Sequence, residues 1–266
     1  MYKRLVREFE SVSPDQKRYW FYSKYSQYHS ITSLDVWTDI PFLQGFIRWL
    51  SGQNDDKNLC HEIKLALLNG ACSSGSEECA LFLLSKGVTP DEETPFYVVE
   101  RGSVSVSRKL LEYDVTQTAR LYMTRSPHYI GLDSNITVLH EACLFEREEM
   151  VTMLCNTYPH LVHDTDDWGH STLHFVARTG NCDIFKTAER VVLESLYRVE
   201  DEQHKCETVE GRVVHRNCVC APYVCQLVTK HTGQTVLHYS CRRGHMEVCK
   251  YLCESYPALT TAVDKY

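Results

Sequence analysis

The sequence lacks long apolar runs and an excess of positive charge. Its longest continuous apolar run, Cys79–Leu84, has six residues, whereas a helix that crosses a bilayer needs about 20. The segment Met1–Glu10 has no apolar core of the kind found in signal peptides. With 28 Lys and Arg against 35 Asp and Glu, the net charge is −7. We therefore expect no membrane insertion and no nucleic-acid partner, because binding a phosphate backbone requires clustered basic side chains.

Motifs that bind phosphates or carry out hydrolysis are also missing. None of the 12 glycines is followed by lysine, which excludes a Walker A loop. Neither G-x-G-x-x-G nor G-x-S-x-G occurs, and His140-Glu141 is not followed by the second histidine of H-E-x-x-H. The sequence therefore predicts a protein that is not an enzyme and has no cofactor.

Cysteine, in contrast, is plentiful. The thirteen cysteines are an odd number, and several occupy positions that suit a small apolar residue, such as Cys143, Cys155, Cys241 and Cys249. Free cysteine packs in this way as a small hydrophobic residue. The pattern favours a reducing compartment, and we expect a cytoplasmic location.

The sequence contains an internal repeat. Thr137–Cys143 reads T-V-L-H-E-A-C and Thr235–Cys241 reads T-V-L-H-Y-S-C, and in both copies Tyr-Pro follows 21 residues after the threonine. A third copy, Ser171–Ala177, starts 34 residues after Thr137. Self-similarity at this period is typical of solenoid proteins.

One unit predicts a helical hairpin. The hydroxyl of Thr235 can cap a short first helix, and Gly244 can end that helix in the left-handed conformation. Val248, Tyr251 and Leu252 recur at helical spacing along a second helix, which Pro257 ends. A hairpin of this size cannot bury its own apolar face, so it must stack on its neighbours.

These units resemble the ankyrin repeat. The matching positions of the last copy are Gly233, Thr235, Leu237, His238, Gly244, His245 and Val248. In the copy at Thr137, Asn135 and Glu146 replace the two glycines, and weaker copies lie around Gly75–Gly87 and Thr94–Leu111. The resemblance implies an all-α solenoid of stacked helix-turn-helix units. It also implies that His140, His174 and His238 form the fold and are not catalytic.

The resemblance divides the chain into three parts. Residues 1–58 are aromatic-rich and are expected to form an N-terminal helical cap, with a patch that docks a partner as the alternative. Residues 59–133 are divergent repeats. Residues 134–266 are clear repeats, interrupted by an insertion at about 200–232.

The insertion is rich in potential metal ligands: His204, Cys206, His215, Cys218, Cys220, Cys225 and His231. Zinc prefers four Cys or His ligands, commonly in Cys-x₂₋₄-Cys pairs. Since the spacing here matches no standard zinc module, we assign no metal site. A structural zinc-binding module remains an alternative.

Ankyrin arrays bind other proteins, so the resemblance implies a scaffold or adaptor with a protein partner of unknown identity. By position in the unit, the expected binding residues are Trp168, His170, Phe175, Arg178, Gln234, Tyr239, Arg242 and Arg243. Alternatively, the chain is the ankyrin segment of a larger effector, such as a channel, a kinase or a nucleotide-binding receptor, that continues past Tyr266. In support of such a fragment, we expect Val248, Tyr251 and Leu252 to face a missing neighbour.

Overall fold

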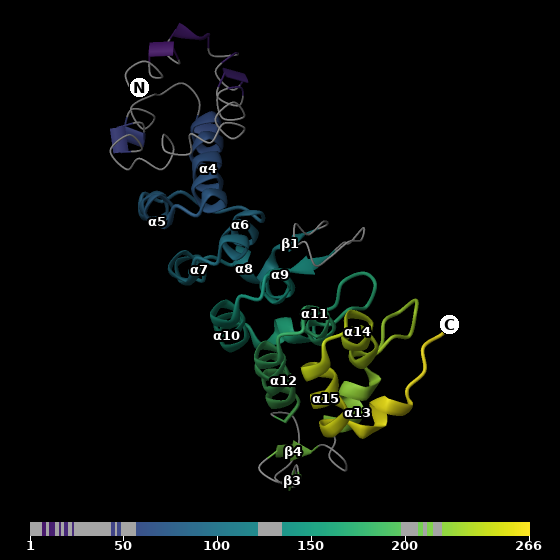
Figure 1. Ribbon diagram of the computed structural model, residues 1–266. Coiled ribbons are helices and arrows are strands. Elements are labelled where there is room, and N and C mark those ends of the chain that lie inside the picture. The colour runs from purple at the N-terminus through teal and green to yellow at the C-terminus, as the bar shows by residue number, and fades with distance from the viewer. Residues whose placement is uncertain are drawn as a thin grey trace. The chain divides into compact units, whose positions relative to one another are not determined.

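The computed structural model divides into two compact units, Met1–Thr116 and Gln117–Tyr266. It describes residues 57–121, 135–197, 207–209, 212–214 and 220–266, with short pieces of the first 48 residues (7–8, 11–13, 16, 19–20, 23, 44–45 and 47–48). Helices dominate both units, which confirms the all-α prediction (Figure 1). Among the described residues no helix is both long and apolar enough to span a membrane.

The first unit contains two helical hairpins where the sequence predicts divergent repeats. They are formed by α4 (Lys57–Ser74) with α5 (Glu77–Ser85) and by α6 (Thr94–Arg101) with α7 (Val104–Leu110). Helix α4 packs on α6, and α5 packs on α7. The Thr94 hydroxyl donates to Oδ1 of Asn69 at 2.6 Å, and Nδ2 of Asn69 donates to Asp91 at 3.1 Å. The two hairpins are thus linked by polar contacts as well as by their apolar faces.

The predicted N-terminal cap lies largely outside the described residues. Tyr19 is a described aromatic residue of that region and its side chain is exposed. The cap, and the alternative docking patch, therefore stay predictions.

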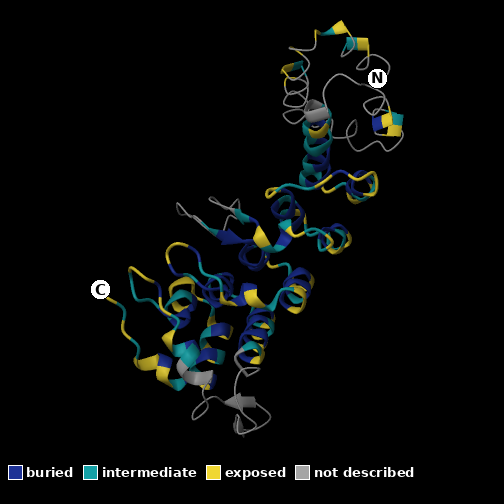
Figure 2. Ribbon diagram, turned by 180° about the vertical axis from the view of Figure 1, so that it is seen from behind, coloured by how far each residue is buried: buried dark blue, intermediate teal, exposed yellow. Residues whose placement is uncertain are grey.

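The second unit is a stack of three hairpins. Each pairs a short first helix with a longer second one: α9 (Val138–Leu144) with α10 (Glu148–Thr157), α11 (Thr172–Thr179) with α12 (Cys182–Tyr197), and α14 (Val236–Arg243) with α15 (Met246–Ser255). First helices pack on first helices, α9 on α11 and α11 on α14. Second helices do the same, α10 on α12 and α12 on α15. Buried residues, dark blue in Figure 2, run along these helices.

Smaller elements complete the second unit. They are α8 (Val115–Thr118), which begins at the border of the units, β1 (Arg120–Leu121), β2 (Ile136–Thr137), η2 (Pro159–His163), β3 (Glu207–Val209), β4 (Arg212–Val214), α13 (Cys220–Gln226) and η3 (Pro257–Thr261). Strands β1 and β2 pair antiparallel, and so do β3 and β4. These two-residue and three-residue strands were not predicted, because they are too short to show an alternating pattern in the sequence.

The three Leu-His motifs cap their own helices. The hydroxyl of Thr137, Ser171 or Thr235 accepts the backbone N–H of the histidine three residues later. In return, the Nδ1 atom of that histidine accepts the backbone N–H of the capping residue, at 3.3, 3.2 and 3.1 Å in chain order. This reciprocal arrangement satisfies two backbone donors at each helix start. It gives the three histidines a structural role.

Two of these histidines, His140 and His174, also contact the next hairpin. The His140 ring stacks on Phe175 with centroids 4.5 Å apart, and His174 meets Tyr239 edge-on at 5.4 Å. Phe175 and Tyr239 occupy the same position in successive units. Successive hairpins therefore share the same contact between a histidine ring and an aromatic ring, as well as the same helical pattern, as expected for a solenoid.

Two residues take the place of glycine in the copy at Thr137. Asn135 and Glu146 have φ angles of +72° and +55°, in the left-handed region that favours glycine. Asparagine tolerates this region better than glutamate does, because its short polar side chain can bond locally.

Replacing Glu146 by glycine should therefore stabilise the second unit, by about 0.5–1 kcal/mol. The side chain of Glu146 is exposed, so no packing is lost. The midpoint of urea unfolding would measure the gain. Asn135→Gly is the matched control and should give a smaller change. A lower midpoint for Glu146→Gly would contradict this account of the backbone.

The expectation that Val248, Tyr251 and Leu252 face a missing neighbour is wrong. Val248 and Leu252 are fully buried within the unit. Tyr251 packs edge-on against Phe185 of α12 at 6.0 Å. The sequence pattern located the apolar stripe of this helix correctly, but that stripe points into the existing stack.

Candidate functional site

A tight turn between η2 and α11 presents the first group of predicted binding residues. It is closed by an antiparallel bridge between Thr165 and Ser171. The buried Asp166 organises it: Oδ1 accepts the backbone N–H of Trp168 at 3.0 Å and that of His170 at 2.7 Å. A carboxylate that accepts several backbone donors holds its loop in one conformation.

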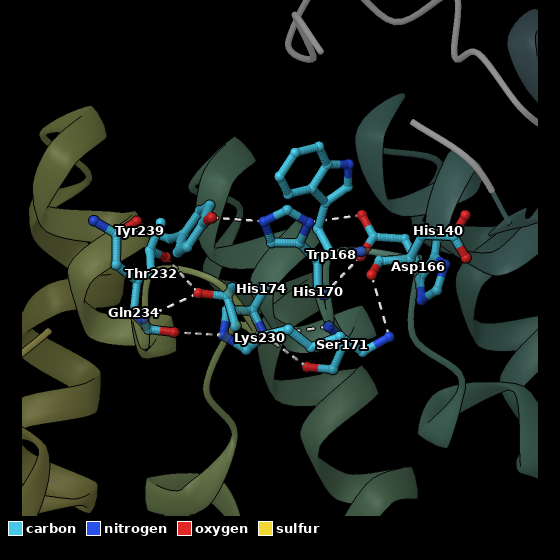
Figure 3. Close-up of polar contacts among 12 residues, drawn as sticks. His140, Asp166, Trp168, His170, Ser171, His174, Lys230, Thr232, Gln234 and Tyr239 are labelled. Carbon is cyan, nitrogen blue, oxygen red and sulfur yellow. Dashed lines mark hydrogen bonds and ion pairs between the residues drawn. The ribbon is translucent and has the colours of Figure 1, made fainter. Parts of the chain in front are cut away.

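A chain of side-chain hydrogen bonds links this turn to the next repeat. Nδ1 of His170 lies 2.6 Å from Oδ2 of Asp166, and Nε2 lies 2.6 Å from the Tyr239 hydroxyl (Figure 3). Burial alone would raise the pKa of Asp166, but the hydrogen bond and charge of His170 outweigh it and lower that pKa. Asp166 is therefore ionised at neutral pH and Nδ1 of His170 donates to it. The turn and helix α14 are fixed to one another.

Trp168 is the exposed residue at the tip of the turn. It is 43% exposed, and its ring meets His231 edge-on with centroids 5.0 Å apart. Its carbonyl accepts the backbone N–H of Lys230 at 2.9 Å. In Figure 3 the indole projects away from His170 and the other labelled side chains. An aromatic side chain held in this way is available to a partner.

Gln234 belongs to the corresponding turn before α14. Its carbonyl accepts Nε2–H of His174 at 3.2 Å, and its Nε2 donates to Asp264 at 3.2 Å. Its backbone N–H donates to the Thr229 hydroxyl at 3.0 Å. Both the backbone and the side chain of Gln234 are therefore hydrogen-bonded to other residues, and its side chain is half-buried.

Three arginines lie at the opposite ends of the first helices. Arg178 is half-buried in the last turn of α11, and Arg242 and Arg243 are exposed in the last turn of α14. Arg178 and Arg242 each lie seven residues after their capping residue, so they are equivalent positions. At 1.5 Å per residue, the arginines and the turns are separated by about 10–12 Å along the helices.

A close approach between repeats occurs just after Arg178. Nε2 of His245 donates to the Arg178 carbonyl at 2.8 Å. A Cβ on Gly180 would overlap the His245 ring, and the φ angle of Gly180 is +89°. Glycine is therefore required there both for its conformation and for the space it leaves.

The prediction that Phe175 lies on the binding surface is wrong. Phe175 is 1% exposed and packs between His140 and His170. At this position the side chain points between two first helices, which are closer together than the sequence pattern alone could show. The remaining seven residues line the turns and first helices, with Trp168, Arg242 and Arg243 exposed and the others half-buried.

The insertion is only partly described. His204, Cys206, His215 and Cys218 lie outside the described residues, and Cys225 is half-buried in α13. No group of three or more potential metal ligands occurs among the residues that the structure describes. The zinc-binding alternative stays a prediction.

Sequence reasoning missed a polar contact that anchors α13. Nε2 of His163 lies 2.5 Å from the Ser195 hydroxyl, and Nδ1 lies 2.9 Å from the Tyr223 hydroxyl. Because the three residues come from η2, α12 and α13, the contact depends on tertiary structure. Asp166 was also not predicted, although Asp264 recurs at its position in the last repeat. In the structure Asp264 likewise accepts the backbone N–H two residues later, at 3.1 Å.

Comparison with known proteins agrees with this geometry. Residues 232–265 match the family model described as ankyrin repeat. No curated protein matches the sequence significantly. Among the 47 matching chains of solved structures, one belongs to the structure of a predatory endopeptidase from Bdellovibrio bacteriovorus in complex with an immunity protein.

The match to that chain has a TM-score of 0.52 at 15% identity and covers 84% of this chain and 97% of the other. This level of identity shows the fold alone, so no peptidase activity follows from it. Three stacked hairpins begin with the same capping motif, and the last of them matches the family model. The last hairpin is therefore an ankyrin repeat, and the two hairpins before it share its capping motif.

Proposed function

We propose that the chain is a scaffold or adaptor that binds a protein partner through its second unit. The surface consists of the turn at residues 164–171, the turn at residues 228–235, and the exposed parts of α11 and α14. The observation that carries the proposal is Trp168, an exposed aromatic side chain on a turn that Asp166 and His170 hold rigid. Tryptophan, tyrosine and arginine are the residue types that most often anchor protein interfaces.

The rigidity of this surface favours binding. The hydrogen bonds of Asp166, His170 and Tyr239 fix the turn at residues 164–171 against helix α14 before a partner arrives. Less conformational entropy is then lost on association, so more of the contact energy appears as affinity. Both ring nitrogens of His170 are engaged, one by Asp166 and one by Tyr239, so the ring is held in one orientation.

The double substitution Trp168→Ala with Arg243→Ala tests the proposal. We expect it to reduce partner capture at least tenfold, because it removes an aromatic and a basic anchor from opposite ends of the surface. The measurement is affinity capture with the full chain, followed by quantitative mass spectrometry. Thermal unfolding of the variant checks that the fold is retained.

The matched control is Arg190→Ala with Glu194→Ala. These two residues form an exposed ion pair on α12, at 2.8 Å, away from both turns. Proteins that bind the proposed surface should remain on this control and be lost from the Trp168 and Arg243 variant. Equal capture by both variants would place the binding site elsewhere.

We also propose a cytoplasmic location for this activity. Ten cysteines in the described part of the chain are free thiols, and Cys72, Cys79, Cys143 and Cys155 are buried in the core. Buried free thiols suit a reducing compartment. Imaging of a tagged full-length chain tests this, and a secreted product would contradict it.

A further inference from the structure

Two cysteines of the last hairpin face each other. Cys241 in α14 and Cys249 in α15 have their sulfur atoms 3.5 Å apart. Cys241 is exposed and Cys249 is half-buried. The Cys249 thiol also donates to the Ser240 hydroxyl at 3.2 Å. A disulfide bond is about 2.05 Å long, so the two sulfur atoms need to approach by about 1.5 Å to bond.

The register of the repeat shows which positions the pair occupies. Ala177 and Phe185 stand at the equivalent positions in the hairpin of α11 and α12, and both are completely buried. They lie under the hairpin of α14 and α15, where Phe185 contacts Tyr251. In the hairpin of α14 and α15 cysteine stands at both positions, with Cys241 exposed and Cys249 half-buried.

We propose that Cys241 and Cys249 form a redox modification site, which a small-molecule disulfide such as glutathione disulfide converts into a disulfide bond between α14 and α15. The site adjoins the proposed partner surface, because Cys241 immediately precedes Arg242 and Arg243 in α14. Disulfide formation needs no protein partner, so either proposal can fail without the other.

The chemistry consists of two thiol–disulfide exchanges. The Cys241 thiolate attacks one sulfur of glutathione disulfide, forming a mixed disulfide and releasing one glutathione thiolate, which takes up a proton. The Cys249 thiolate then attacks the Cys241 sulfur and expels the second glutathione. The protein loses two hydrogens and glutathione disulfide is reduced to two glutathione molecules.

The surroundings of the pair set its rate. Burial, together with the hydrogen bond and charge of Cys249 and the nearby Cys253, raises the pKa of Cys241 to about 11. Little Cys241 is therefore thiolate at neutral pH, and the reaction should speed up roughly tenfold per pH unit between pH 7 and 9. Such slow exchange suits a protein whose thiols are reduced under ordinary cytoplasmic conditions.

Tryptic digestion makes the test direct. Cleavage after Lys230, Arg242, Arg243, Lys250 and Lys265 places Cys241, Cys249 and Cys253 on three different peptides. The full chain is incubated with glutathione disulfide at pH 8 and then alkylated. Before alkylation we expect the intact protein to be about 2 Da lighter, and after alkylation and digestion we expect one linked pair of peptides, joining Cys241 to Cys249.

Two variants distinguish this pair from its neighbours. Cys249→Ser should stop the reaction at the mixed disulfide and leave a glutathione adduct on Cys241. Cys253→Ser is the matched control on the same helix and should still form the Cys241–Cys249 link. A persistent glutathione adduct on the wild-type Cys241, a link from Cys241 to another cysteine, or no reaction at all would overturn the proposal.

Discussion

Acidification from pH 6.5 to pH 4 should destabilise the second unit by several kcal/mol. Burial lowers the pKa of His140 to about 3 and that of His174 to about 4, against 6.5 for a free histidine. In the unfolded chain both rings take up a proton below pH 6.5, whereas in the folded chain they stay neutral until the pH approaches their lowered values. The stability is therefore fully present above pH 6.5 and is lost as the pH falls toward 4 and 3. At pH 4, protonation of each ring in the unfolded chain lowers the free energy of unfolding by on the order of 3 kcal/mol relative to its value above pH 6.5.

The double variant His140→Gln with His174→Gln tests this cause. Glutamine cannot be protonated here, and it is a natural partner at the third position of a capping box. We expect urea unfolding of the variant to depend much less on pH between 6.5 and 4. His238→Gln is the control, because it alters the same motif at a half-exposed ring. An unchanged pH dependence in the double variant would show that other groups govern acid unfolding.

The second large effect of pH on stability comes from Glu189 in α12, and it has the opposite sign: stability falls as the pH rises. Burial raises the pKa of its carboxyl group to about 7, although the hydrogen bond from Tyr251 and the charge of Lys186 partly offset that shift. The folded chain therefore holds the carboxyl proton more tightly than the unfolded chain, whose value is 4.5. The resulting stability is fully present below pH 4.5 and is lost as the pH rises through 7. The change is on the order of 3 kcal/mol.

Glu189→Gln should remove this loss. The amide is neutral at every pH and its oxygen can still accept the Tyr251 hydroxyl, so we expect the variant to be more stable than the wild type at pH 8. Chemical unfolding at pH 5 and pH 8 would measure the difference. Glu194→Gln is the control, because Glu194 is exposed on the same helix. If Glu189→Gln and the wild type lose stability equally between pH 5 and pH 8, Glu189 is not the group responsible.

The repeat architecture could be predicted because its signals are local. A capping hydroxyl, a histidine three residues later and a residue able to adopt a positive φ define each first helix, and all of these can be read from the sequence. Glu146 shows the limit of this reasoning. It adopts the left-handed conformation although its residue type gives no sign of it.

The candidate site was less predictable because its contacts cross between repeats. Position in the unit identified Trp168, but it also suggested that Phe175 was exposed, since the sequence does not show how closely α9, α11 and α14 pack. The bond from His170 to Tyr239 spans 69 residues, and the contact of Tyr251 with Glu189 spans 62. No local pattern encodes such pairs.

The contact between α11 and α14 has a consequence for how the chain tolerates added sequence. Nε2 of His174 bonds directly to the Gln234 carbonyl across 60 residues, so the two hairpins stack as neighbours despite the sequence inserted between them. Roughly doubling the length of a flexible connection costs only about 0.6 kcal/mol of closure entropy. The solenoid therefore accommodates a long insertion between two consecutive hairpins at a small cost in free energy and without a change of register.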